Sequence, residues 1–149
     1  MISKVKPTKR QAFSWDPEFR ERTKDIEEQL GRFTGNKNDI GNKEVFMLAL
    51  ATGFHFKKQR PRPPRATDAV RLSAVREHEF AIFRSIALAH TKDYLILLDQ
   101  DAMYDIIEEY AAGGLEILVT ELDTGIDFKN FLTKLLFEQA KAVSALQVN

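Results

Sequence analysis

Apolar residues at helical spacing constrain the fold of this 149-residue chain more than any other feature. They recur at residues 43–54, 77–89, 102–112 and 127–145, and a shorter run follows the third segment at 115–122. Each segment has the three-to-four-residue period of an α-helix with one buried face. No segment alternates apolar and polar residues convincingly. We therefore predict an all-α fold, a compact multi-helix single domain, with room for one short β-hairpin that the pattern does not place.

The apolar segments also indicate which residues pack inward. Ile82 and Leu88 fall on the wide apolar face of the second segment, and Leu136 falls on that of the last one. We expect all three to be buried. In the first segment, the small residues Ala49 and Gly53 would let another element approach closely.

Capping residues and glycines predict where the helices begin and end. Asp16, followed by proline, is expected to start a charged surface helix over residues 17–30, and Asp101 is expected to cap the helix that follows it. The pair Gly113-Gly114 is expected to end one helix and start the next, because glycine is the usual helix terminator.

The remaining segments complete the expected organisation. Residues 1–15 are basic and are predicted to form a flexible arm, before a single mostly helical domain over 16–149. Within it, residues 57–67 are predicted to form an extended basic connector, and a short helix is expected around 69–73. The apolar run 94–98 fits a buried strand or a helix, and its flanks favour helix.

Composition excludes several classes of protein. The chain has no cysteine, which removes disulfides, thiol catalysis and cysteine-ligated metal sites. No apolar run approaches the ~20 residues of a transmembrane helix. The basic start lacks the apolar stretch of a secretory signal. We therefore expect a soluble, cytoplasmic protein with no membrane partner.

The net charge of zero hides two oppositely charged halves. Residues 1–76 contain 17 lysines and arginines against 9 acidic residues, a net charge of +8, and residues 77–149 contain 5 against 13, a net charge of −8. Such asymmetry is typical of a surface for a polyanion or a protein partner. The alternative is that the two halves neutralise each other within one fold.

An acidic cluster is the one candidate for a metal site. Asp101, Asp105 and Glu108 share one helix face, and their oxygens suit a hard cation. The same residues fit an ordinary helix start, where carboxylates favour the positive end of the helix dipole. The calcium-loop pattern is incomplete, so we expect no metal.

Catalytic motifs are missing. The histidines His55, His78 and His90 do not have the spacing of a helical zinc site, and no nucleophile elbow or phosphate-binding loop is present. We therefore expect no enzymatic activity, no cofactor and no small-molecule substrate.

The basic connector is the most informative segment. Prolines at 61, 63 and 64 hold it extended, and its cations would lie along a strip that could follow DNA phosphates. We refer to this predicted site as the basic strip; its members are Lys57, Lys58, Arg60, Arg62, Arg65 and Arg71. Three alternatives stay open: a polyproline ligand for a protein partner, a solvated linker, and a strip that pairs with the acidic half of the chain.

Three segments taken together resemble a known family. They are KEVFMLALATGF at residues 43–54, the stretch from Glu79-Phe80 to Ile86-Ala87, and IEEYAAGGL at residues 107–115. In order and spacing they resemble the small accessory proteins of bacterial DNA phosphorothioation (dnd) systems called dnd system-associated protein 4. The resemblance covers about residues 40–122.

This resemblance implies a cytoplasmic protein encoded with antiphage defence genes, acting beside larger nuclease or ATPase components. It implies no catalytic residue. Our first hypothesis is a non-enzymatic accessory component that contacts duplex DNA through the basic strip. The alternative is a protein-interaction subunit that docks a larger component without touching DNA.

Overall fold

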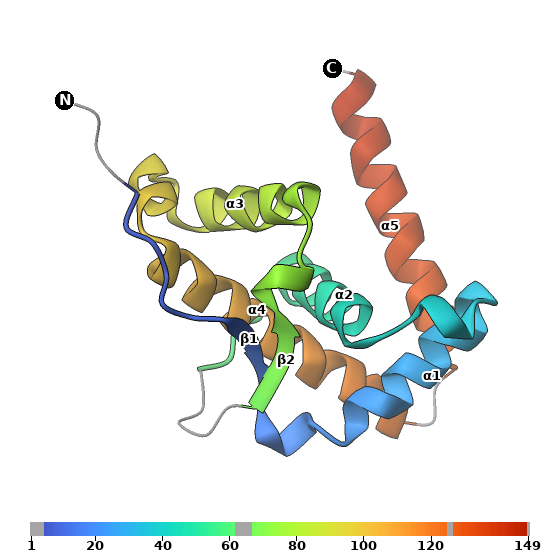
Figure 1. The fold of residues 1–149 in the computed structure, drawn as a ribbon. Helices are drawn as coiled ribbons and strands as arrows, with labels where there is room; N and C mark the ends of the chain where they lie inside the picture. The colour runs from blue at the N-terminus through green and yellow to red at the C-terminus, as the bar shows by residue number, and fades with distance from the viewer. Residues whose placement is uncertain (1–4, 62–66, 125–126, 149) are drawn as a thin grey trace.

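Five α-helices and one two-stranded sheet make up the described part of the chain, residues 5–61, 67–124 and 127–148 of a computed structural model (Figure 1). The elements, in chain order, are β1 (Ala12–Trp15), α1 (Arg22–Thr34), α2 (Asn42–His55), β2 (Thr67–Arg71), α3 (Glu77–Thr91), α4 (Gln100–Asp123) and α5 (Phe128–Val148). Short 3-10 helices lie at 17–19, 37–39, 72–74 and 94–98. The prediction of an all-α single domain is confirmed, and the run 94–98 is helical, as its flanks indicated.

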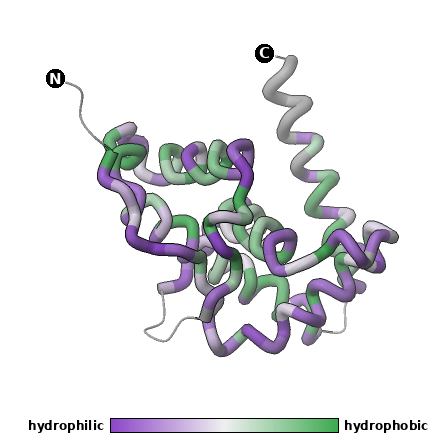
Figure 2. The backbone as a smooth tube through the Cα atoms, viewed as in Figure 1, coloured by the Kyte–Doolittle hydropathy of each residue, from purple (hydrophilic) through white to green (hydrophobic). Residues whose placement is uncertain are grey.

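The core forms where α2 crosses α4. Hydrophobic residues recur along both helices, whereas the segments that lead into β1 and α1 are more hydrophilic (Figure 2). Phe46 and Leu50 of α2 and Ile107 and Leu115 of α4 are almost fully buried. The α1 and α3 helices and the sheet pack around this pair, so α2 and α4 position everything else.

Glycines allow α2 and α4 to touch at the backbone. A Cβ atom added to Gly114 would lie 1.6 Å from the Ala49 carbonyl oxygen, and one added to Gly53 would lie 1.9 Å from the Tyr110 carbonyl oxygen. The close approach expected at Ala49 and Gly53 is confirmed. The predicted helix break at Gly113-Gly114 is wrong, because α4 runs through both glycines without interruption. Glycine is used here for the space it leaves rather than for its backbone freedom.

The sheet joins two segments that are distant in sequence. β1 and β2 pair antiparallel, with Phe13 opposite Val70 and an irregularity after Phe13. We expected a flexible arm over residues 1–15, but the structure differs over β1, where Phe13 and Trp15 are buried. Phe13 stacks on Phe46 with ring centroids 5.1 Å apart. These aromatic side chains give the segment a place in the core; residues 1–4 of the arm lie outside the described residues.

β2 replaces the short helix expected around residues 69–73. Ala69 and Val70 are buried in this strand, and a 3-10 helix follows at residues 72–74. Local propensity missed the strand because the partner that satisfies its backbone, β1, comes from a distant, earlier part of the chain.

Two predicted helix starts are shifted. Asp16 caps a 3-10 turn, its Oδ1 accepting a hydrogen bond from the Glu18 N–H at 3.0 Å, and α1 begins only at Arg22. Asp99 rather than Asp101 caps α4, since its Oδ1 accepts from the Ala102 N–H at 3.2 Å.

Within the described residues, no helix has the length and apolarity needed to span a membrane.

The contact between α2 and α4 predicts an unusual response to alanine. Helix propensity alone would make Gly114→Ala stabilising by about 1 kcal/mol. We expect instead a loss of at least about 3 kcal/mol in the free energy of unfolding, because the new methyl group must displace the α2 backbone. Urea unfolding followed by circular dichroism measures it.

Gly41→Ala is the matched control. The nearest atom to a Cβ there is Glu44 Oε2 at 3.5 Å, an ordinary contact, so we expect a loss below about 1 kcal/mol. Equal effects of the two substitutions would contradict the close contact.

Candidate functional site

Two members of the basic strip, Lys58 and Arg60, are held against α2 and α4 by backbone contacts. The Lys58 N–H donates to the Gly53 carbonyl oxygen at 2.8 Å, and the Arg60 N–H donates to the Glu109 carbonyl oxygen at 3.0 Å. A Cβ at Gly113 would lie 2.1 Å from the Lys58 carbonyl oxygen, so this glycine lets the strip lie directly on α4. The segment leaving α2 is therefore anchored, at least as far as Arg60.

Arg60 is the centre of an ion-pair cluster. Its guanidinium contacts Asp16 Oδ2 at 2.9 Å, Glu18 Oε2 at 2.5 Å and Glu116 Oε2 at 3.3 Å. It also lies over the ring of Phe19, 4.6 Å from the ring centroid. Burial acts to lower the pKa of Arg60, but Asp16 and Glu18 outweigh it and hold that pKa above its ordinary value. Arg60 is thus committed to carboxylates of its own chain.

The other members of the strip differ in their surroundings. Lys58 Nζ lies 3.4 Å from Glu116 Oε1. Lys57 and Arg71 are exposed, and neither forms an ion pair with another residue of the described chain. Arg62 and Arg65 lie outside the described residues. The structure therefore brings together Lys58 and Arg60, through Glu116, and leaves Lys57 and Arg71 open to solvent.

The acidic face of α4 is occupied by the N-terminal segment. The Thr8 hydroxyl donates to Asp101, and Arg10 pairs with Asp105 at 2.5 Å and with Glu108. The Ser14 N–H also donates to Glu108 Oε2 at 3.1 Å. Within the described residues, no three acidic or histidine side chains are arranged to hold a metal ion.

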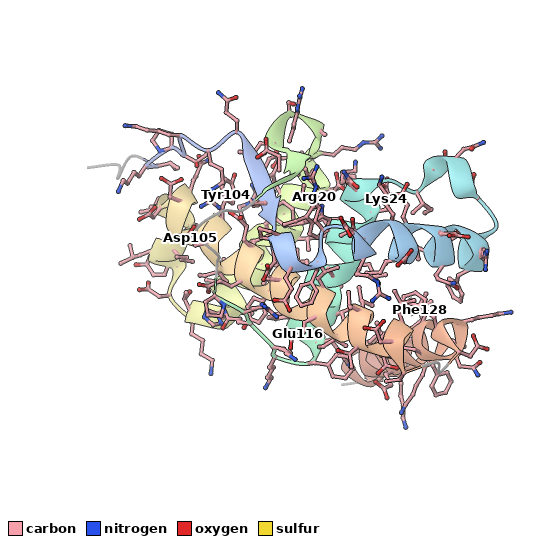
Figure 3. The ribbon with its side chains drawn as sticks, turned by 90° about the horizontal axis from the view of Figure 1, so that it is seen from below. Arg20, Lys24, Tyr104, Asp105, Glu116 and Phe128 are labelled. Carbon is pink, nitrogen blue, oxygen red and sulfur yellow. The ribbon has the colours of Figure 1, made fainter. Side chains whose placement is uncertain are left out.

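Glu108 shows why this contact matters for the fold. Its side chain is only 3% exposed, and a buried carboxylate is costly unless a cation and hydrogen bonds satisfy it. Figure 3 shows Asp105 and Glu116 at separate points along α4. Each binds an arginine from the basic half, Arg10 at the first point and Arg60 at the second.

Two histidines have defined partners. His90 Nδ1 lies 2.7 Å from the Tyr110 hydroxyl, and burial raises the pKa of that tyrosine. His55 Nε2 lies 3.3 Å from Glu138 Oε2 and so links the end of α2 to α5. These contacts join helices to each other.

Sequence reasoning missed the exposed apolar surface. Ile82 and Leu88 on α3 and Leu136 on α5, all expected inside, are exposed. Phe137 and Phe56 are exposed as well. A helix that is apolar on more than one face gives no sign of which face the fold will cover.

Two shallow hollows adjoin this apolar surface. One, of about 400 Å³, lies between the end of α2, α4 and α5; its lining residues are Phe56, Glu121, Asn130, Phe131, Lys134, Leu135 and Glu138. The other, of about 450 Å³, lies between α2 and α3; its lining residues are Phe54, Ala81, Ile82, Ser85, Ile86 and Ala89.

A comparison with known protein families identifies the family of this chain. The family model described as DNA sulphur modification system-associated protein 4 matches residues 21–147. The chain belongs to this family. The match extends the resemblance seen in the sequence to include α1 and most of α5. No curated protein and no solved structure matches the chain.

Membership in this family makes the protein an accessory component of a DNA sulphur modification system. The matched region contains both hollows and the α2–α4 contact, and it begins after β1 and Arg10. The N-terminal segment that covers the acidic face of α4 thus lies outside the matched region.

The ion-pair cluster predicts that alanine substitution of two nearby cations of the strip changes the free energy of unfolding by different amounts. Arg60→Ala should lower the free energy of unfolding by about 2 kcal/mol or more, because Asp16, only 7% exposed, loses its cation. Lys57→Ala is the matched control and should change it by less than about 0.5 kcal/mol. Urea unfolding measures both. Similar losses in the two variants would show that the cluster does not stabilise the fold.

Proposed function

We propose that the protein is a non-enzymatic docking subunit, which binds a larger protein component of its DNA modification and antiphage defence system through α5. The observation that carries this proposal is the exposure of two large apolar residues on α5, Leu136 at 56% and Phe137 at 68%. The family description, an associated protein of a modification system, supports an accessory role.

Among the described side chains of α5, the buried apolar ones lie in the first part of the helix. Phe128, Leu132 and Leu135 are buried against the rest of the protein. From there the helix extends away from the domain (Figure 1). Its 21 residues span about 31 Å, which is much longer than the stretch from Phe128 to Leu135 that contains the buried residues. A projecting helix with exposed apolar side chains is typical of a surface that a protein partner covers.

The hollow at the base of α5 supplies the rest of such a surface. Phe56, 47% exposed, and Phe131 give it an apolar floor. Glu121, Lys134 and Glu138 surround the floor with charge of both signs. An apolar centre with a polar rim is the usual composition of a protein interface. The occupant we propose is another protein of the system that the family description names.

A binding experiment with purified components tests this proposal. Each larger protein of the same system is titrated separately with the wild-type protein and with the double variant Leu136→Glu/Phe137→Glu. We expect one component to bind and the double variant to weaken that binding at least tenfold, because two carboxylates would have to be desolvated in the interface.

Thr133→Glu adds a carboxylate to an exposed polar position of the same helix and serves as the control. It should leave the affinity within about threefold of wild type. Binding by no component, or equal binding by wild type and the double variant, would contradict docking through α5.

Direct contact with DNA is the second candidate function. The exposure of Lys57 and Arg71 favours it, since neither is committed to a carboxylate of the described chain. Together with Arg62 and Arg65 they would leave four cations of the basic strip for phosphates. Arg60, by contrast, already binds three carboxylates, which weakens the strip as a DNA surface.

Titration of a labelled DNA duplex at two salt concentrations tests this second candidate. Contact through the strip predicts binding that weakens steeply with salt. Replacing Lys57, Arg62, Arg65 and Arg71 with alanine should reduce the salt slope by about 3 to 4, close to one unit for each phosphate contact. No binding at low salt, or an unchanged slope in the variant, would rule out the strip as a DNA surface.

A further inference from the structure

The segment before β1 lies on the domain without burying an apolar side chain. We call residues 5–11 the strap; its sequence is VKPTKRQ. Val5 is 48% exposed and Pro7 is exposed as well. The residues that follow differ, because Phe13 and Trp15 of β1 are buried in the core. In Figure 1 the blue segment that leads to β1 runs along the outside of the beginning of α4.

The backbone of the strap pairs with the start of α4. The Lys6 N–H donates to the Leu98 carbonyl oxygen at 2.6 Å, and the Lys6 carbonyl oxygen accepts from the Gln100 N–H at 3.2 Å. The Thr8 N–H donates to Gln100 Oε1 at 2.9 Å. Backbone hydrogen bonds combined with side-chain contacts from alternate residues are typical of the recognition of an extended peptide.

Three carboxylates of α4 receive the side chains of the strap. The Thr8 hydroxyl donates to Asp101. The Arg10 guanidinium spans Asp105 and Glu108. A planar guanidinium can bind two carboxylates at once, whereas a lysine ammonium is a single point charge. Glu108 is buried, so it needs such a cation whichever chain supplies it.

The strap and these carboxylates differ in their relation to the family. All three carboxylates lie within residues 21–147, which the family model matches, and the strap lies before that region. The matched region therefore includes the acidic face of α4 but not the segment that covers it.

We infer that the acidic face of α4 is a docking site for an extended, arginine-bearing segment of another protein, and that the strap is its competitor within the chain. Exchange of one arginine for another keeps Glu108 paired, so the buried carboxylate is never left alone. The strap can leave while β1 stays in the sheet, because no buried apolar side chain holds it. These residues are separate from α5, so the inference does not depend on the proposed function.

The strap sets a threshold for the partner. A tethered segment competes at an effective concentration in the millimolar range. A segment from another protein must therefore bind α4 more tightly than the strap does before it can replace the strap. An arginine that reaches both Asp105 and Glu108 is the feature we expect such a segment to share with the strap.

A labelled peptide with the strap sequence, VKPTKRQ, tests the inference. It is titrated against the full-length protein and against the full-length variant Thr8→Ala/Arg10→Gln, whose own strap has lost its side-chain contacts with α4. We expect the variant to bind the peptide at least about tenfold more tightly, because the fraction of open sites limits the apparent affinity of wild type. Fluorescence anisotropy measures binding, and circular dichroism checks that the variant is folded.

Lys9→Gln is the matched control in the protein. It removes a cation next to Arg10, but Lys9 is exposed and forms no ion pair within the described residues. This variant should bind the peptide within about threefold of wild type. Adding Asp101→Asn/Asp105→Asn to the double variant should weaken its peptide binding at least about tenfold. The peptide VKPTKKQ, in which lysine replaces the arginine, should also bind the double variant more weakly.

Hydrogen exchange of the wild-type protein tests whether the strap opens by itself. The Thr8 amide should exchange at least about tenfold faster than the hydrogen-bonded amides of the β1–β2 sheet, because the strap opens without unfolding the core.

Four results would overturn the inference. They are equal peptide binding by wild type and the double variant, no binding by the double variant, binding that is unchanged by Asp101→Asn/Asp105→Asn, and a Thr8 amide that exchanges only together with the sheet. A double variant that binds a system component through α5 as tightly as wild type, but does not bind the peptide, would overturn this inference and leave the proposed function intact.

Discussion

The backbone contact between α2 and α4 is the constraint on which the rest of this fold depends. Gly53 and Gly114 remove the side chains that would otherwise separate the two helices, so each helix packs directly on the carbonyl groups of the other. This crossing sets the position of α4, which is the longest helix and contacts every other layer. The neighbouring Gly113 leaves room for the segment after α2, so Lys58 and Arg60 lie directly on the surface of α4.

Once α4 is fixed, it neutralises part of the charge asymmetry of the chain. Its acidic residues bind Arg10 near one end and Arg60 near the other, and both arginines come from the basic half. The expectation that the two halves neutralise each other within one fold holds for these residues. A cation held this way stabilises the fold and is costly to remove, so local charge density in the sequence overstates the charge available to a polyanion.

Sequence patterns predicted what depends on local periodicity and missed what depends on distant partners. The helices were predictable because their apolar period is strong. As a local signal, Gly113-Gly114 predicts a helix end, but in the fold Gly114 lies beside Gly53 and lets α2 and α4 touch. The pairing of β1 with β2 and the acid partners of Arg60 join residues far apart in the chain, which no local pattern records. Ile82 and Leu88 were misplaced because periodicity identifies an apolar face without showing whether the fold covers it.

Native-state hydrogen exchange, resolved by residue, tests the central role of the α2–α4 crossing most directly. The account predicts that the amides of residues 49–53 and 110–115 exchange only through global unfolding, with a free energy equal to that of urea denaturation. The amides beyond residue 136 of α5, which projects from the domain, should exchange much faster. Exchange of residues 110–115 through a local opening well below the global value would contradict the account, because it would mean that α4 is interrupted at its glycines.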